Sequence, residues 1–173
     1  MILRLGHLGL TVSDLERARS FYCDLFGFEE FFRVRRKTPW IAAQVGYLDA
    51  DIEFCHLRHP GIGLHLELCK YRSPRSAKRL DGETYVPGAA HFNLWVDDVG
   101  DLLEKIRAYI QTMPSPGLAR VQRLPDRRFD LEATTITEGP QTGGKGVYVR
   151  TPDGHTIEIW QPAKTEEAQR FGK

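Results

Sequence analysis

Hydrophobic and polar residues alternate along several short segments of the chain, which is the pattern of a strand with one buried face. In the segment 63–71, leucines occupy every second position and polar residues lie between them. The segments 7–12, 91–96 and 155–161 alternate in the same way. Because successive side chains of a strand point to opposite faces, each segment is predicted to have one aliphatic face and one polar face.

Two other segments have the three- and four-residue hydrophobic spacing of an amphipathic helix. The first runs to Phe26, and Ser13 with Glu16 predicts a capping box at its start. Gly27 is expected to end this helix. The second helix follows an acidic pair and runs to about Ile110.

The same order of elements occurs twice along the chain. Each half begins with a strand headed by a histidine, His7 or His91, and continues with an acidic helix cap, a helix and three further strands. The two histidines are separated by close to half of the chain. We therefore predict an α+β fold of two βαβββ modules, at about 3–72 and 89–163, within one domain of residues 1–173.

The other segments are predicted as further strands or as connections. Residues 38–46 are expected to form a short helix, 73–88 a linker between the modules, and 114–130 a long polar loop. The remaining strands are expected at 28–36, 51–58, 131–138 and 145–150.

Composition is that of an ordinary globular protein, with 41% hydrophobic and 27% charged residues. The net charge is only +1, so no global basic excess indicates a nucleic-acid partner. The three cysteines match neither a disulfide framework nor a C-x-x-C motif. No apolar run is long enough to span a membrane, and the first residues turn polar too quickly for a signal peptide. We therefore expect a cytoplasmic protein without a membrane or nucleic-acid partner.

Histidine and glutamate recur on the polar faces of four predicted strands. Alternation places His7, Glu67, His91 and Glu158 opposite the aliphatic faces. If they converge, two imidazoles and two carboxylates form a site for divalent zinc, nickel, cobalt, manganese or iron. A single His or Glu on a strand is more often solvated or hydrogen-bonded, so an ordinary polar face is the alternative.

Four segments carry a resemblance to a known family. They are 7–29, 65–74, 89–99 and 143–162, of which the last, GGKGVYVRTPDGHTIEIWQP, is the most specific. These segments resemble the vicinal oxygen chelate superfamily, which includes glyoxalases, methylmalonyl-CoA epimerases, cyclitol epimerases, extradiol dioxygenases and bleomycin-resistance proteins. The resemblance implies paired βαβββ modules that form an open barrel around a metal site.

The resemblance also implies a ligand set and a class of reaction. The metal positions of the superfamily fall on His7, Glu67, His91 and Glu158. Extradiol dioxygenases use two His and one Glu, whereas the isomerase, lyase and epimerase branches fill a fourth position at the place of Glu67. All four positions are filled here. This favours a metal-dependent epimerase or isomerase, or a glyoxalase-like lyase, that abstracts a proton next to a carbonyl.

Within this hypothesis Glu67 and Glu158 are the catalytic residues, and Glu67 is either a fourth ligand or a base. The cofactor is one divalent ion per site, with zinc, nickel, cobalt or manganese expected for an epimerase and iron for a dioxygenase. The small-molecule substrate is a keto-sugar or cyclitol, an acyl thioester or a hemithioacetal. An iron extradiol dioxygenase and a non-enzymatic, ligand-sequestering resistance protein are the alternatives.

Four further residues are candidates for substrate binding, namely His65, Arg35, Trp95 and Tyr148. For each, a structural role in the cavity wall, on a solvated strand or in the interior is the alternative. Because modules of this kind expose sheet edges, we also expect a homodimer. The sequence leaves open whether each site is built within one chain or across the dimer.

Overall fold

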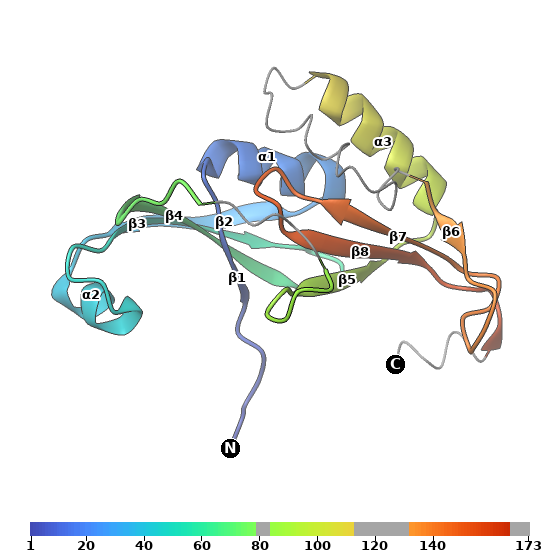
Figure 1. Ribbon diagram of the computed structural model, residues 1–173, viewed down its shortest axis with the longest axis horizontal. Helices are drawn as coiled ribbons and strands as arrows, with labels where there is room; N and C mark the ends of the chain where they lie inside the picture. The colour runs from blue at the N-terminus through green and yellow to red at the C-terminus, as the bar shows by residue number, and fades with distance from the viewer. Residues whose placement is uncertain (79–83, 113–131, 167–173) are drawn as a thin grey trace. The chain divides into compact units, whose positions relative to one another are not determined.

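Figure 1 shows the computed structural model, which describes residues 1–78, 84–112 and 132–166. The chain divides into two compact units, Met1–Arg79 and Leu80–Lys173, called unit 1 and unit 2 below. Each unit contains one βαβββ module and one four-stranded mixed sheet, so the predicted α+β fold is confirmed. The loop predicted at 114–130 lies outside the described residues.

Unit 1 contains one element more than the basic module, a short second helix. Its sheet has the strand order β1-β4-β3-β2, in which β1 is parallel to β4 and the other neighbours are antiparallel. The predicted short helix at 38–46 is therefore confirmed. The elements are β1 (Leu8–Thr11), α1 (Leu15–Phe26), β2 (Glu29–Arg36), α2 (Pro39–Val45), β3 (Asp51–Arg58) and β4 (His65–Ser73).

The aliphatic face of this sheet packs against α1, which contacts β2, β3 and β4. Leu57, Leu66 and Leu68 are completely buried on the sheet side, and Phe21 and Tyr22 are buried on the helix side. The two-residue alternation therefore predicted the buried face of β4 correctly.

The start of α1 differs from the predicted capping box. The N-cap is Asp14, whose backbone is extended and whose carboxylate accepts a hydrogen bond from the Arg17 N–H at 2.9 Å. The Ser13 hydroxyl instead accepts a hydrogen bond from the Arg17 guanidinium at 2.9 Å. Serine and aspartate are both good caps, and the carboxylate also interacts favourably with the helix dipole. Gly27 ends the helix in the left-handed conformation, with φ of 69°, as predicted.

Unit 2 repeats this topology with the strand order β5-β8-β7-β6, in which β5 is parallel to β8. The strand predicted at 131–138 is wrong in length. Beyond Thr135 the backbone of Ile136 bonds to Gly143 and Gly144 of the following turn, so pairing with β7 stops. The elements are β5 (His91–Trp95), α3 (Val99–Thr112), β6 (Thr134–Thr135), β7 (Lys145–Arg150) and β8 (Thr156–Gln161).

The core of unit 2 lies between β8 and α3, which contact each other. Ile157, Ile159 and Val149 are buried on the strands, and Leu103 and Ile106 are buried on the helix. Each four-stranded sheet keeps two edge strands, so neither sheet closes on itself. In the described parts of the chain, no helix has the length and apolar character needed to cross a bilayer.

Candidate metal and substrate site

The face of the unit 1 sheet that lies opposite α1 carries His7 and Glu67. The His7 Nε2 atom lies 3.5 Å from the Glu67 Oε2 atom, and the side chains are 44% and 18% exposed. The pair forms because parallel pairing of β1 and β4 places Gly9 beside Glu67. His7 precedes Gly9 by two positions and therefore lies on the same face.

Unit 2 builds the same pair from the corresponding strands. The His91 Nε2 atom lies 3.4 Å from the Glu158 Oε2 atom, and the side chains are 43% and 18% exposed. Parallel pairing of β5 and β8 places Asn93 beside Glu158, and His91 precedes Asn93 by two positions. The internal repeat therefore reproduces one His–Glu pair, with nearly the same separation and exposure, in each unit.

Both pairs have the spacing of neighbouring metal ligands. Two donor atoms that each lie about 2.1 Å from an ion, about 110° apart, are separated by about 3.4 Å. Imidazole nitrogen and carboxylate oxygen are donors that zinc, nickel, cobalt, manganese and ferrous iron accept. Within residues 1–78, 84–112 and 132–166, no group of three or more His, Cys, Asp or Glu is arranged to hold a metal ion. Each unit therefore presents a pair that fits half of a four-ligand site.

The Glu67 carboxylate has additional polar neighbours in unit 1. The His56 Nε2 atom lies 3.6 Å from Glu67 Oε1, because antiparallel pairing places His56 directly opposite Glu67. The Cys69 thiol donates to Glu67 Oε2 at 3.4 Å, and burial raises the pKa of this thiol, which keeps its proton. His56 is itself held by His65, with 3.0 Å between Nδ1 and Nε2. Burial lowers the pKa of both imidazoles.

Hydrophobic side chains cover other parts of this face. At one end Ile41 of α2 packs with Ile52, and Phe54 and Tyr71 border this cluster. At the other end the Phe31 ring lies against the imidazoles, with 5.1 Å between its centroid and that of His65. The polar centre around Glu67 is therefore enclosed by apolar groups on both sides along the strands.

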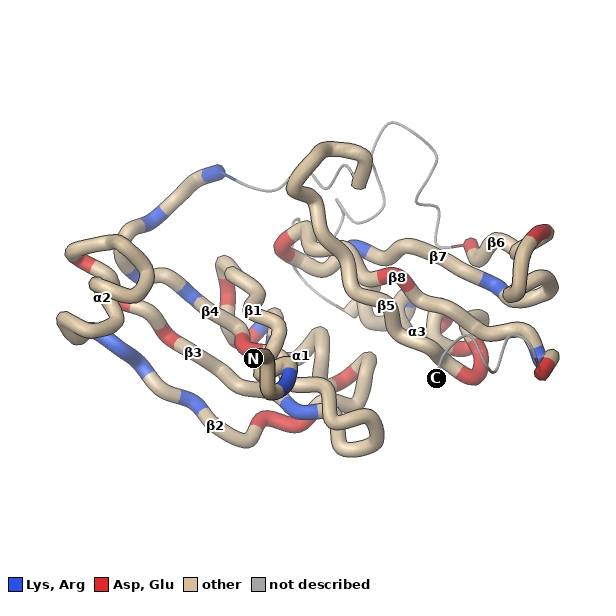
Figure 2. Tube along the Cα trace, turned by 90° about the horizontal axis from the view of Figure 1, so that it is seen from below, with Lys and Arg blue, Asp and Glu red and all other residues tan. Residues whose placement is uncertain are grey.

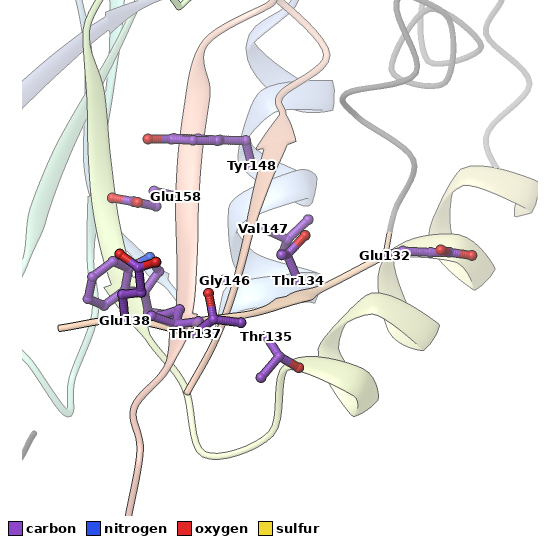
Figure 3. Close-up of a pocket in the computed structure, with 11 residues that line it drawn as sticks. Glu132, Thr134, Thr135, Thr137, Glu138, Gly146, Val147, Tyr148 and Glu158 are labelled. Atoms are coloured by element: carbon purple, nitrogen blue, oxygen red, sulfur yellow. The ribbon is translucent and has the colours of Figure 1, made fainter. Parts of the chain in front are cut away.

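The Glu158 carboxylate lies beside a cavity instead. Antiparallel pairing places Tyr148 directly opposite Glu158, and the two side chains point the same way in Figure 3. Burial and the nearby Glu158 raise the pKa of Tyr148, so the phenol keeps its proton. The cavity has a volume of about 500 Å³ and is lined by Glu132, Thr134, Thr135, Ile136, Thr137, Glu138, Gly146, Val147, Tyr148, Glu158 and Trp160.

The structure places two of the other predicted substrate-binding residues on the polar faces. His65 lies on the same face as Glu67 and hydrogen-bonds His56, which is the structural role expected as its alternative. The Trp95 ring stacks on Trp160, with 6.3 Å between centroids and 27° between planes.

Arg35 lies on the opposite face of its sheet from Glu67, since it pairs with Glu53 rather than with His56. Its guanidinium donates two hydrogen bonds, of 2.7 and 2.6 Å, to the Asp51 carboxylate and lowers the pKa of Asp51. Figure 2 shows the basic residues spaced along β2. The structure therefore does not bring Arg35 to the His7–Glu67 pair.

Sequence reasoning missed His56 and most of the cavity. Alternation in the segment 51–58 places Phe54, His56 and Arg58 on one face, which was a usable signal for His56. The cavity gave no comparable signal, because Thr137 and Glu138 lie in a segment predicted as an uninterrupted strand.

Comparison with known proteins decides the family. Residues 4–159 match the family model of the Glyoxalase/Bleomycin resistance protein/Dioxygenase superfamily. The chain belongs to this superfamily. The resemblance carried by the four sequence segments is therefore confirmed.

Individual known proteins are similar to this chain over most of its length. A 2-epi-5-epi-valiolone epimerase from Actinomyces sp. is 27% identical over 155 residues, which cover 88% of this chain and 76% of that protein. A glyoxalase family protein from Bacillus cereus has a TM-score of 0.71 at 14% identity, covering 94% of this chain and 95% of that chain.

A variant of the fosfomycin resistance protein from Listeria monocytogenes has a TM-score of 0.51 at 17% identity, covering 99% of each chain. It was solved with Mn(II) and a dihydroxypropylphosphonic acid. At these identities the two solved structures show the fold alone. The manganese is therefore a property of that fosfomycin resistance protein, and the Actinomyces relative is named as an epimerase.

Proposed function

We propose that this superfamily member is a metal-dependent epimerase or isomerase that abstracts a proton from a carbon next to a carbonyl group. The observation that carries the proposal is the repeated His–Glu pair, with 3.5 and 3.4 Å between nitrogen and oxygen. The 27% identity with an epimerase supports the same class of reaction.

The proposed metal site takes both pairs: His7, His91 and Glu158 are ligands to one divalent ion, and Glu67 is either the fourth ligand or a base beside the ion. Two imidazoles and two carboxylates complete a four-ligand set that zinc, nickel, cobalt and manganese accept. When bound, such an ion acts as a Lewis acid that polarises the substrate carbonyl and makes the neighbouring C–H more acidic.

In the proposed reaction the carboxylates move the proton. One of them, Glu158 or Glu67, takes the hydrogen as a proton from the carbon next to the carbonyl, and the C–H electron pair forms an enolate, which is an enediolate where that carbon carries a hydroxyl group. The other carboxylate, in its protonated form, returns a proton to the same carbon from the opposite side. The configuration inverts, and the two carboxylates exchange protonation states. Glu158 lies beside the cavity and Tyr148, so substrate is expected to meet this carboxylate directly.

Cyclitol ketones and keto-sugars are the first substrates to test, because the relative named above acts on a valiolone. Acyl thioesters and hemithioacetals are the other carbonyl classes that the same chemistry serves. The test incubates the full chain in deuterium oxide with manganese, zinc, nickel or cobalt and each candidate. Nuclear magnetic resonance then measures deuterium at the carbon next to the carbonyl. Lack of exchange in all three classes would contradict the proposal.

Metal content tests the ligands separately from activity. We expect the wild type to bind one divalent ion per proposed site, and His7→Ala and His91→Ala to lose most of it. Retention of stoichiometric metal by His91→Ala would reject the ligand set. The alternative, an iron extradiol dioxygenase, predicts instead that the protein with ferrous iron consumes oxygen when catechols are added.

A mixture of the two histidine variants locates the site. After the variants are unfolded together and refolded, a mixed dimer holds one intact set of ligands if each site takes its two pairs from different chains. Metal that returns on mixing therefore indicates a site built across a homodimer. Metal that stays lost indicates a site built within one chain.

A further inference from the structure

The cavity beside Glu158 has an acidic, hydroxyl-rich lining (Figure 3). Its ionisable side chains are Glu132, Glu138, Glu158 and Tyr148, and threonines supply further hydroxyl groups. Among the described residues that line it, none is Lys, Arg or His. Carboxylates accept hydrogen bonds from substrate hydroxyls and repel phosphate, phosphonate and carboxylate groups. The lining therefore favours a ligand with many hydroxyls and no negative charge.

Trp160 supplies an aromatic wall whose position depends on a glycine. Gly146 of β7 lies directly across from Trp160 in the antiparallel pair. A Cβ atom at position 146 would lie 3.1 Å from the indole Nε1 and 3.2 Å from Cδ1. The bare backbone at Gly146 therefore leaves room for the indole at this place. An indole offers an apolar surface to the C–H groups of a ring whose hydroxyls bind elsewhere.

The three glutamates of the lining do not all lie on one side of the cavity. In the view of Figure 3, Glu138 lies on the same side as Glu158, and Glu132 lies across from them. Glu138 is exposed and follows the end of β6, so its charge is open to a ligand that enters beside Glu158. This carboxylate is therefore placed to select among ligands by their charge and hydroxyl groups.

We propose that this cavity binds an uncharged polyhydroxylated ring, such as a cyclitol ketone or a keto-sugar, with Glu138 and Trp160 as specificity-determining residues. The inference rests on the proposed function, because it makes the cavity the place where the substrate meets Glu158. A cavity built to bind hydroxyls discriminates strongly against ligands that leave its polar groups unpaired. Thioesters on phosphorylated carriers and phosphonates are excluded from this cavity by their charge.

The test compares myo-inositol with myo-inositol 1-phosphate, which differ only in the phosphate. Isothermal titration of the full chain in the presence of a chelator measures both affinities without any divalent ion. We expect myo-inositol to bind at least about tenfold more tightly than its phosphate. Because neither metal nor turnover enters the measurement, a failure of the proposed epimerase reaction leaves this result unaffected.

Charge reversal at the exposed Glu138 tests its role without disturbing the core. We expect Glu138→Lys to weaken the binding of myo-inositol and to strengthen the binding of its phosphate, each by about tenfold. Glu104→Lys on α3 is the matched control, since the Glu104 side chain is 75% exposed and lies outside the lining. This control should leave both affinities unchanged.

Gly146→Ala tests the aromatic wall, because the added methyl group would lie 3.1 Å from the indole Nε1 and the indole must shift by a few tenths of an ångström. We expect weaker binding of myo-inositol, with a circular dichroism spectrum like that of the wild type.

The proposal is overturned if the wild type binds myo-inositol 1-phosphate as tightly as it binds myo-inositol. It is also overturned if myo-inositol does not bind at concentrations on the order of 10 mM, or if Glu138→Lys leaves both affinities unchanged.

Discussion

The two units share a topology and a His–Glu pair but differ in the residues around the glutamate. The position directly opposite Glu67 on the antiparallel neighbour is His56, whereas the position opposite Glu158 is Tyr148. On the parallel neighbour the corresponding positions are Gly9 and Asn93. The pairs have the same spacing, so the repeated topology alone is sufficient to place a His beside a Glu.

The surroundings give the two glutamates different neighbours. Glu67 lies among His56 and Cys69 on a face that α2 and Phe31 partly cover. Glu158 lies beside Tyr148 and an open cavity. The comparison shows Glu67 among polar side chains on a partly covered face, and Glu158 beside an open cavity, which is where the proposed function has substrate enter.

Replacing each glutamate with glutamine should have the largest effect on activity. Glu67→Gln and Glu158→Gln keep the shape of the side chain and an oxygen donor but remove the base. We expect each to lower epimerisation by roughly 10²–10⁴-fold, the usual contribution of general acid–base catalysis. The measurement is the rate of interconversion of the two epimers, with bound metal determined in parallel.

Exchange of hydrogen with solvent sharpens this prediction. If each carboxylate serves one face of the substrate, each variant still exchanges the hydrogen of one epimer and not of the other. Loss of exchange from both epimers in Glu158→Gln, with normal exchange in Glu67→Gln, would instead assign proton transfer to Glu158 alone.

Equivalent core residues should contribute equally to the free energy of unfolding in the two units. Leu66 and Ile157 immediately precede the glutamates, face the helices and are completely buried. We expect Leu66→Ala and Ile157→Ala each to lower the free energy of unfolding by about 2–5 kcal/mol. Urea titration measures this, and Leu66→Met, which conserves volume, should cost less than about 1.5 kcal/mol. A strongly unequal cost would show that one unit depends less on its own core.

His56 should matter for metal affinity although it is not a proposed ligand. Its Nε2 atom lies 3.6 Å from Glu67 Oε1, so this imidazole borders the carboxylate of the pair. We expect His56→Ala to weaken metal binding by about 10–100-fold, as removal of groups that support a ligand usually does. Tyr148→Phe is the matched change in unit 2 and should affect metal binding less. Competition with a chromophoric chelator measures both affinities.

The Arg35–Asp51 pair should affect stability and leave substrate binding unchanged. Because Arg35 lowers the pKa of Asp51 in the folded protein, the pair stabilises the protein above the usual aspartate pKa of about 3.9. This contribution is lost as the pH falls through the lowered value. We expect Arg35→Met to lower the urea midpoint at pH 7, and we expect the difference from the wild type to shrink as the pH falls below about 3.9. Arg36→Met is the control for the loss of a positive charge on the same strand. An increase in KM for Arg35→Met would contradict this prediction and indicate that Arg35 binds substrate.

Local patterns predicted the faces of the strands correctly because alternation does not depend on tertiary context. Leu66 and Glu67, or Ile157 and Glu158, point to opposite faces whatever the neighbouring strand. The cap of α1 was shifted by one position because Ser13 and Asp14 are both able to cap. Local sequence does not distinguish between them.

The partners of each glutamate could not be predicted in the same way. His56 reaches Glu67 only through the register of β3 with β4, which the turn between them sets. Arg35 was predicted near substrate without knowledge that Asp51 would bind it. The cavity depends on the early end of β6 and on the small size of Gly146, and neither follows from periodicity.

The parallel pairing of the first and last strands has a consequence for the order of folding. His7 and Glu67 come from the first and last strands of unit 1, and His91 and Glu158 come from the first and last strands of unit 2. Each pair therefore assembles only after the intervening helix and strands have closed a long loop, a slow step in folding. A metal ion that binds completed pairs would slow unfolding and leave the folding rate unchanged. Such an ion would therefore lengthen the time for which the outermost strand of a module stays docked on its sheet.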